Sequence, residues 1–493
     1  MKAHYIALAA GLSLAACGGS PEVRTALSAP VLVTNMPPPP GEARAFQLPE
    51  IQETTLANGL QVYLVNRDGF PTVSARLTID GGIEDFSGES YVLGHSVIHL
   101  LRTGTSSWNA DAISQMIDAN GIGFSTSANE EFAQVNASAL SPKFSTIVEL
   151  IGGLVSSPTF PEDRVTAKAA ELAGEESLSR SRPEFHLERM VRRALAPADH
   201  SYARYSPESE DFSSVNHESA TAAWQSRFAP QIARLVIVGD LPEDALAQVN
   251  AAFSQWDNGS FEDTIAEPFT ATPCNEAHVV VRENSAQTSI AWLTLAPAQD
   301  APGYYDALLA NQVLGGGASA RLFMNLREDK SYTYGAYSRF QHSRAQSFLR
   351  VSSNVRGEVT EGALVEFEYE FNRYAHDPLT SDLEDARAYL SGVFPILLET
   401  NSAIAGQITS LLNGEQNLET LSTYRDSVNA VTEQDARTAG ASLFAQDNMV
   451  LVMVGERDNV VPTAVAHASI VYVYDLDGAL VETLDGEQES TCE

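Results

Sequence analysis

The sequence has 493 residues, with 64 aspartates and glutamates against 30 lysines and arginines, so its formal net charge is −34. A chain with this charge repels a phosphate backbone, which excludes nucleic acid as its partner. The hydrophobic content of 44% is that of a globular protein. At roughly 150 residues per domain, the length predicts about two to four domains.

The N-terminus reads as an export signal. Residues 1–16 contain a lysine near the start and an apolar run that is too short to span a bilayer. The run Leu14-Ala15-Ala16-Cys17 resembles the lipobox of bacterial lipoproteins, which implies that Cys17 is lipidated after cleavage. No aspartate follows Cys17, which implies sorting to the outer membrane, with the body facing the periplasm. A plain signal peptide with an incidental cysteine is the alternative.

Between this signal and the body, residues 17–45 include the run Pro37-Pro38-Pro39-Pro40 and are expected to form an extended linker. The remaining cysteines, Cys274 and Cys492, would lie in an oxidising compartment. The sequence leaves open whether they form a disulfide.

The body of the chain contains an internal repeat. Residues 217–239 predict a helix, a turn and a buried strand that ends in glycine, and residues 432–455 repeat this order. A phenylalanine, Phe228 or Phe444, precedes the final glycine by the same interval in both copies. Each half also begins with predicted strands, at 60–65 and 73–79 in the first half and at 278–282 and 288–295 in the second.

This pattern predicts an α+β fold with two homologous domains, residues 46–256 and 276–460. The acidic segment 257–275 contains glycine and prolines and is expected to be a linker. Residues 461–493 form a C-terminal extension, in which residues 469–484 alternate around Asp477-Gly478 and predict a hairpin.

Seven short motifs resemble the pitrilysin/insulinase family of zinc metallopeptidases, in the family's order. They are TTLANGLQV (54–62), LGHSVIHLL (93–101), SPTFPED (157–163), LGGGASARLF (314–323), LREDKSYTYGAYS (326–338), SGVFPILLETN (391–401) and NMVLVMVG (448–455). The match is nearest to the branch of short subunits that includes mitochondrial processing peptidase. The resemblance implies two α/β-sandwich domains that form half of a clam-shell chamber.

The family's chemistry needs a helix with His-x-x-Glu-His, in which two imidazoles bind Zn²⁺ and the glutamate deprotonates the metal-bound water. Here His95 and His99 keep the spacing, but Ile98 occupies the position of the general base. An aliphatic side chain cannot accept a proton, so we expect no peptide hydrolysis by this chain alone. The resemblance places a third ligand at Glu171, with Glu175 as the alternative. The residues leave open whether these groups hold zinc or are ordinary polar residues of a decayed site.

Two further sites follow from the resemblance. Arg327 and Tyr334 match the family's arginine–tyrosine pair, which reaches across the chamber to the substrate carbonyl. A loop arginine and a strand tyrosine without function are the alternative. Residues 121–128 match the edge strand that pairs with an extended substrate, through Gly121, Gly123, Phe124, Ser125 and Thr126. On sequence grounds they are equally an internal strand. The run Gly315-Gly316-Gly317 lacks the features of a nucleotide-binding loop and predicts a tight turn near the chamber wall.

Together these features predict a lipid-anchored, proteolytically incompetent subunit that complements a family member with an intact His-x-x-Glu-His in cleaving peptides. Two alternatives remain at this point. One is a peptide-binding or scaffolding envelope lipoprotein without a peptidase partner, and the other is a peptidase that is active on its own through a displaced carboxylate. The net charge leads us to expect that basic peptides are favoured if the acidity extends into the chamber.

Overall fold

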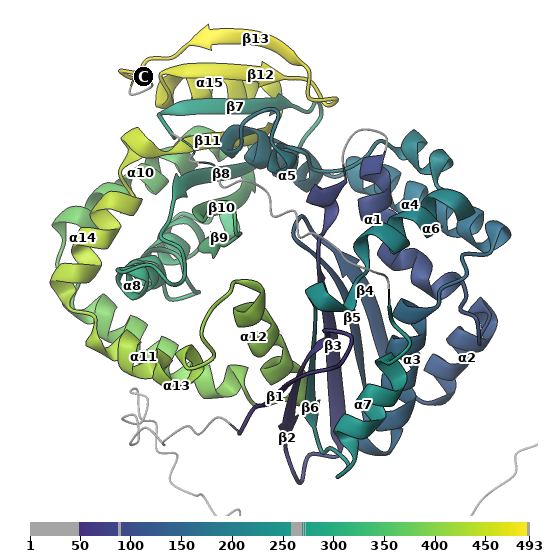
Figure 1. The fold of residues 1–493 in the computed structure, drawn as a ribbon. Helices are drawn as coiled ribbons and strands as arrows, with labels where there is room; N and C mark the ends of the chain where they lie inside the picture. The colour runs from purple at the N-terminus through teal and green to yellow at the C-terminus, as the bar shows by residue number, and fades with distance from the viewer. Residues whose placement is uncertain (1–48, 87–89, 258–268, 270, 272, 491–493) are drawn as a thin grey trace, which may run out of the picture. The chain divides into compact units, whose positions relative to one another are not determined.

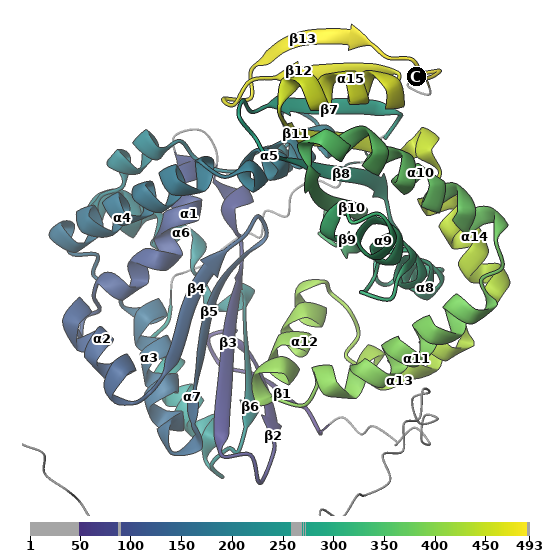
Figure 2. The same ribbon diagram turned by 180° about the vertical axis from the view of Figure 1, so that it is seen from behind.

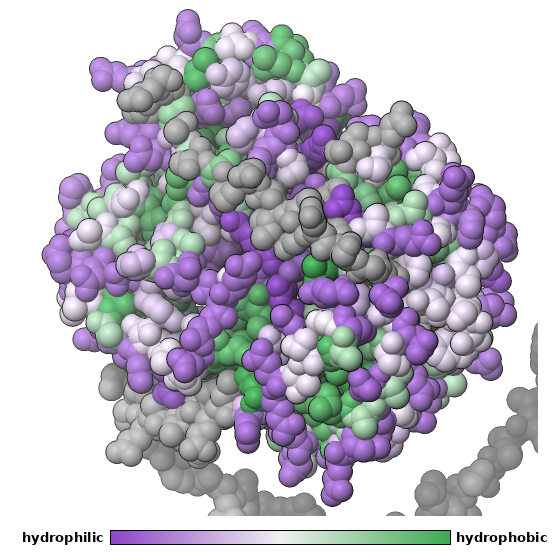
Figure 3. Space-filling view, viewed as in Figure 1, coloured by the Kyte–Doolittle hydropathy of each residue, from purple (hydrophilic) through white to green (hydrophobic). Residues whose placement is uncertain are grey.

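The computed structural model describes residues 49–86, 90–257, 269, 271 and 273–490. The described residues belong to one compact unit, and the face drawn in Figure 3 is largely hydrophilic with smaller hydrophobic patches. The predicted export signal, the proline-rich linker and Cys17 lie outside the described residues. Within the described part of the chain, no helix combines the length and the apolar composition needed to cross a bilayer.

Two mixed sheets organise the compact unit (Figures 1 and 2). The N-terminal sheet has the strand order β1-β2-β6-β3-β5-β4, and the C-terminal sheet has the order β13-β12-β7-β11-β8-β10-β9. The N-terminal strands are β1 (Gln52–Thr55), β2 (Gln61–Asn66), β3 (Thr72–Asp80), β4 (Gly123–Ala128), β5 (Phe132–Leu140) and β6 (Ala233–Gly239). The C-terminal strands are β7 (Glu276–Val281), β8 (Gln287–Leu295), β9 (Thr333–Gln341), β10 (Phe348–Arg356), β11 (Val450–Gly455), β12 (Ile470–Tyr474) and β13 (Leu480–Asp485).

Helices pack on both sheets. Those of the N-terminal half are α1 (Tyr91–Leu100), α2 (Ala110–Ala119), α3 (Phe144–Ser156), α4 (Glu162–Arg180), α5 (Pro183–Leu195), α6 (His217–Arg227) and α7 (Ala245–Phe253). Those of the C-terminal half are α8 (Tyr304–Leu314), α9 (Arg321–Phe323), a π-helical turn (Met324–Asp329), α10 (Thr360–His376), α11 (Thr380–Leu397), α12 (Asn401–Asn413), α13 (Thr420–Ala430), α14 (Glu433–Leu443) and α15 (Arg457–His467). The predicted α+β fold with two homologous domains is confirmed.

The internal repeat is present as two equivalent helix–strand units. Helix α6 leads into β6, and α14 leads into β11, each through a buried phenylalanine, Phe228 or Phe444. Both strands are buried along their whole length apart from one residue of β6, because they lie inside their sheets. The four strands predicted at the start of the two halves are found as β2, β3, β7 and β8.

The two halves exchange helices across their sheets. Helix α5, from the N-terminal half, buries Leu187, Met190 and Val191 against the apolar side chains of β8 and β11. Helix α12, from the C-terminal half, buries Ile404 and Ile408 against β2 and β6. Separating the halves would expose both clusters, so burial of apolar surface holds them together.

A buried ion-pair cluster adds to this connection. The guanidinium of Arg234 donates to both carboxylate oxygens of Asp80, at 2.8 and 2.7 Å. Arg344, from the C-terminal half, donates to Oδ1 of the same carboxylate at 3.2 Å. The Asp80 side chain is only 5% exposed, so two arginines compensate its charge inside the protein.

The C-terminal extension belongs to the second sheet. Strands β12 and β13 form the predicted antiparallel hairpin around Gly478, and β12 pairs with β7 in parallel. Cys274, just before β7, is disulfide-bonded. Nδ2 of the adjacent Asn275 donates to the carbonyl of Glu489 at 2.6 Å. Cys492, for which the sequence left a disulfide with Cys274 open, lies outside the described residues.

Candidate functional site

Helix α1 carries the degenerate zinc motif. The Ile98 side chain has no exposed surface and packs in the main apolar cluster of the N-terminal half. Val92, Val97 and Leu100 of the same helix are also buried there. The position that should carry the general base therefore holds a core residue, and no water can reach it.

The two histidines of α1 are uncharged at neutral pH. Burial lowers the pKa of His95 to about 4; the charge of Glu130 opposes this shift, while those of Arg192 and His99 add to it. Burial also lowers the pKa of His99 to about 4, with Lys168 adding to the shift. Nδ1 of His99 is hydrogen-bonded to Oγ1 of Thr126 at 2.9 Å, whereas Nε2 of His95 is buried without a hydrogen-bond partner in the described structure. Neutral imidazoles are the form that binds metals.

The third zinc ligand expected on α4 does not join them. Glu171 is paired with Lys168 at 2.9 Å, and its side chain is 57% exposed. Glu175 is also exposed. The least exposed carboxylate of this run is Glu176, which sequence reasoning passed over; it is paired with Arg180 at 3.0 Å. No group of three or more metal-ligating side chains is assembled within the described residues.

Two cations act on the histidines of α1, Arg192 on His95 and Lys168 on His99. Arg192 forms an ion pair with Glu130 close to His95, and Lys168 acts on His99. Arg204 stacks over the ring of Tyr91 at 5.3 Å, and this ring contacts His95 edge-on at 5.0 Å. Arg192 and Lys168 are each paired with a carboxylate, and in the described part of the chain no third ligand joins the two histidines, so the residues present do not fit a zinc ion.

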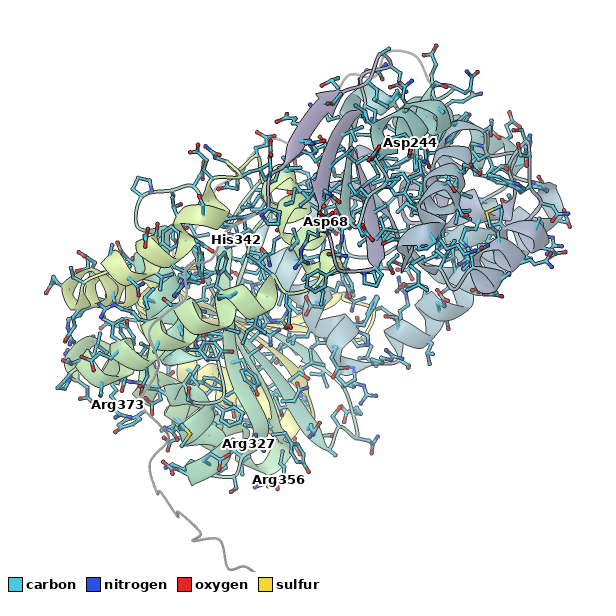
Figure 4. The ribbon with its side chains drawn as sticks, turned by 90° about the horizontal axis from the view of Figure 1, so that it is seen from below. Asp68, Asp244, Arg327, His342, Arg356 and Arg373 are labelled. Atoms are coloured by element: carbon cyan, nitrogen blue, oxygen red, sulfur yellow. The ribbon has the colours of Figure 1, made fainter. Side chains whose placement is uncertain are left out.

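Arg327 and Tyr334, by contrast, are brought together. Both line one cavity of about 950 Å³ in the C-terminal half, together with Arg282, Arg356 and Glu358. The Tyr334 side chain is 89% exposed, and the guanidinium of Arg327 stacks over the ring of Phe323 at 4.7 Å. Figure 4 shows Arg327 and Arg356 close to each other at one end of the C-terminal sheet. Sequence reasoning missed Arg282 and Arg356, because neither residue belongs to a motif.

Arg327 is held by an unusual element. It lies in the π-helical turn Met324–Asp329, which leads into β9. Nδ2 of the buried Asn325 donates to Glu370 at 2.8 Å and to Glu366 at 2.9 Å. Glu366 is also paired with Lys330 at 2.5 Å, so carboxylates of α10 secure both ends of the turn. π-Helical turns cost stability and occur frequently at functional sites.

The strand proposed to receive substrate lies at an edge. Among the described strands, β4, with Gly123, Phe124, Ser125 and Thr126, pairs only with β5, and Gly121 precedes it at a φ of +61°. Its backbone is therefore open on one side, as the edge alternative requires. Thr126 is the residue bound to His99, so β4 and α1 are directly connected.

The glycine run packs closely against neighbouring elements, including β9. The amide of Ser338 donates to the carbonyl of Gly315 at 2.8 Å. A Cβ atom at Gly315 would lie 2.5 Å from Oγ of Ser338, and one at Gly316 would lie 2.4 Å from Oε1 of Gln312. Only glycine allows this close approach, which accounts for the run as a packing feature.

Comparison with known proteins agrees with this arrangement. A family model described as Insulinase (Peptidase family M16) matches residues 61–201, and one described as Peptidase M16 inactive domain matches residues 214–390. The two ranges together span more than half of the chain. The uncharacterized zinc protease YmxG of Bacillus subtilis is 22% identical over 405 residues, which are 80% of this chain and 96% of that protein.

Solved structures share the fold. The peptidase M16 inactive domain from Pseudomonas fluorescens superposes with a TM-score of 0.75 at 24% identity, over 82% of this chain and 98% of that chain. The periplasmic protease PqqL from Escherichia coli superposes with a TM-score of 0.68 at 15% identity, over 82% of this chain but only 45% of PqqL. Motif order, fold and family matches together establish that the chain belongs to the pitrilysin/insulinase (M16) family of metallopeptidases, as a member in which isoleucine replaces the glutamate of His-x-x-Glu-His.

Proposed function

We propose that this chain is a non-catalytic subunit that pairs with an M16-family member carrying an intact His-x-x-Glu-His, and that the pair cleaves peptides. In this pair Arg327 and Tyr334 act on the partner's zinc site. The partner supplies the metal and the general base, and this chain supplies donors for the carbonyl oxygen as it gains negative charge during attack.

The observation that carries the proposal is the contrast between the two sites of the chain. At the first site the base is replaced by the fully buried Ile98, and the expected ligand Glu171 is bound to Lys168. At the second site Tyr334 is 89% exposed, and its hydroxyl has no hydrogen-bond partner among the described residues. A phenol and a guanidinium that share an open cavity have the geometry to serve a substrate held by another subunit.

The similarity to PqqL supports pairing. This chain covers 45% of that periplasmic protease, which leaves room there for a second unit of similar size. The open edge of β4 offers a place for an extended peptide, which would add a strand through backbone hydrogen bonds. We further propose that lipidated Cys17 and the linker 17–45 tether the pair to the outer membrane on its periplasmic side.

Reconstitution tests this function. The protein and a His-x-x-Glu-His family member encoded beside it are purified separately, and cleavage of quenched fluorescent peptides is measured for each and for the mixture. We expect chelator-sensitive cleavage by the mixture and none by this chain alone. Cleavage by the partner that is not raised by adding this chain would contradict the proposal and favour a peptide-binding lipoprotein without a peptidase partner.

A further inference from the structure

The cavity beside Arg327 and Tyr334 is basic, in a protein whose net charge is −34. Three of its lining residues are arginines, at positions 282, 327 and 356, and Glu358 is the one acidic residue among them. Hydroxyl and amide side chains supply further donors, from Ser285, Ser331, Thr333, Asn354 and Gln287. Among the residues that line this cavity, arginines outnumber acidic side chains.

The topology explains why the arginines meet. Arg282 follows β7, and Arg356 ends β10 opposite Gln287, the first residue of β8. Tyr334 lies at the start of β9, with Thr333 opposite Val355 of β10. Because β9 and β10 run antiparallel, the start of one and the end of the other meet at the same end of the sheet. Arg327 reaches this end from the π-helical turn before β9.

The charges of these arginines are only partly compensated. Arg356 Nε donates to Glu358 at 2.8 Å, and Arg327 Nε lies 3.5 Å from the exposed Glu328. Arg282 donates to Oγ of Ser285 at 2.9 Å and to the carbonyl of Ser181 at 3.3 Å, and no carboxylate lies within 4 Å of it in the described structure. In the loop after β7, the backbone amide of Ser285 donates a hydrogen bond to the carboxylate of Glu456 at 3.2 Å.

We propose that this cavity is a carboxylate-binding subsite, in which Arg282 and Arg356 hold an acidic group of the peptide while Arg327 and Tyr334 face its backbone. Guanidinium groups bind carboxylates with strong, directional hydrogen bonds, and the neighbouring hydroxyl groups add donors. This inference rests on the proposed function, because that function makes the ligand a peptide. It reverses, for this subsite, the expectation that the acidic chain selects basic peptides.

The carboxylate has two sources, an aspartate or glutamate side chain and a free peptide C-terminus. Binding of short fluorescein-labelled peptides to the purified chain is followed by fluorescence anisotropy at low ionic strength. The first peptide has an amidated C-terminus and an internal asparagine, the second replaces the asparagine by aspartate, and the third keeps the asparagine but has a free C-terminus. No partner is needed, so failure of this experiment and failure of reconstitution are distinguishable.

We expect the second or the third peptide to bind about threefold to tenfold more tightly than the first, and the preferred one identifies the source of the carboxylate. Arg282→Gln and Arg356→Gln should each abolish this preference. Arg356 is 51% exposed, so its variant tests the subsite even if Arg282→Gln does not fold. Arg339→Gln, on an exposed residue of β9 outside the cavity, removes the same charge and should keep the preference. Equal binding of all three peptides, or equal loss in the Arg339 control, would overturn the proposal.

Discussion

Restoring the missing base should damage the fold instead of creating a peptidase. Ile98 has no exposed surface, so Ile98→Glu loses the burial of a large aliphatic side chain, about 1.5–3 kcal/mol. It also places a carboxyl group among apolar side chains without a hydrogen-bond partner, which costs about 1–3 kcal/mol more. The expected loss of unfolding free energy is therefore about 2.5–6 kcal/mol, a large part of the ~5–15 kcal/mol typical of a folded protein.

The loss should depend on pH with a definite sign. Burial raises the pKa of the new carboxyl group above its value in the unfolded chain, so the folded state retains its proton to higher pH. The variant is then least destabilised at low pH and loses stability as pH rises through the range between the two pKa values. Ile98→Gln has a similar shape but no charge, and its cost should not vary with pH. Ile98→Val should cost only about 0.5–1.5 kcal/mol.

Urea unfolding followed by tryptophan fluorescence measures these differences at pH 5 and pH 8, and a peptide-cleavage assay runs in parallel. We expect a lower urea midpoint for Ile98→Glu and no chelator-sensitive cleavage. We conclude that residue 98 faces the core and that the neighbouring site does not fit zinc. An Ile98→Glu variant that is as stable as the native chain and cleaves peptides in the presence of zinc would refute both conclusions.

Three more results are expected. Asp80→Asn should lower the free energy of unfolding by about 3–5 kcal/mol, because it leaves Arg234 and Arg344 without a full countercharge. Arg344→Gln should cost less, because Asp80 then still pairs with Arg234, and equal urea midpoints for the two variants would contradict this. Burial opposes protonation of His467, but hydrogen bonds and the charge of Glu368 outweigh burial and raise the pKa of the histidine. The His467–Glu368 pair therefore stabilises the fold at low pH, and this stabilisation is lost as pH rises through the raised pKa. His467→Gln should accordingly cost more at pH 5.5 than at pH 9 in urea unfolding, and an equal cost at both would be inconsistent with it. The purified chain, after dialysis against zinc and then buffer, should hold far less than one zinc per molecule by elemental analysis, and stoichiometric zinc would show that the histidines of α1 bind it.

Local patterns in the sequence were enough to predict the helices and strands. They were not enough to predict that helices of each half pack on the sheet of the other half. Strands such as β2 and β6 were predictable because continuous apolar runs end in turn residues. The covering of these strands by α12 was not, since Ile404 and Val236 meet through contacts between distant parts of the chain. No periodicity within either segment encodes such a contact.

In the candidate sites, too, some features are visible in the sequence and others depend on the three-dimensional structure. The loss of the base is visible in the sequence at Ile98, and the order of the motifs pointed to Arg327 and Tyr334. That Glu171 binds Lys168, and that Arg282 and Arg356 join the cavity, depends on how helices and strand ends meet in three dimensions. The zinc ligand set expected from the family resemblance is therefore not assembled among the described residues, whereas the arginine–tyrosine pair lies in a larger site than the motif indicates.

The central claim is that this chain acts on peptide cleavage through a residue it lends to another subunit. The most direct measurement is kcat of the reconstituted pair with Tyr334→Phe in this chain, with subunit affinity measured alongside. Because Tyr334 is 89% exposed, the change should leave folding and pairing intact. The account predicts that kcat falls by about 10²–10³-fold while subunit affinity stays constant, since one donor to the developing negative charge is removed. An unchanged kcat in a fully assembled pair would contradict it.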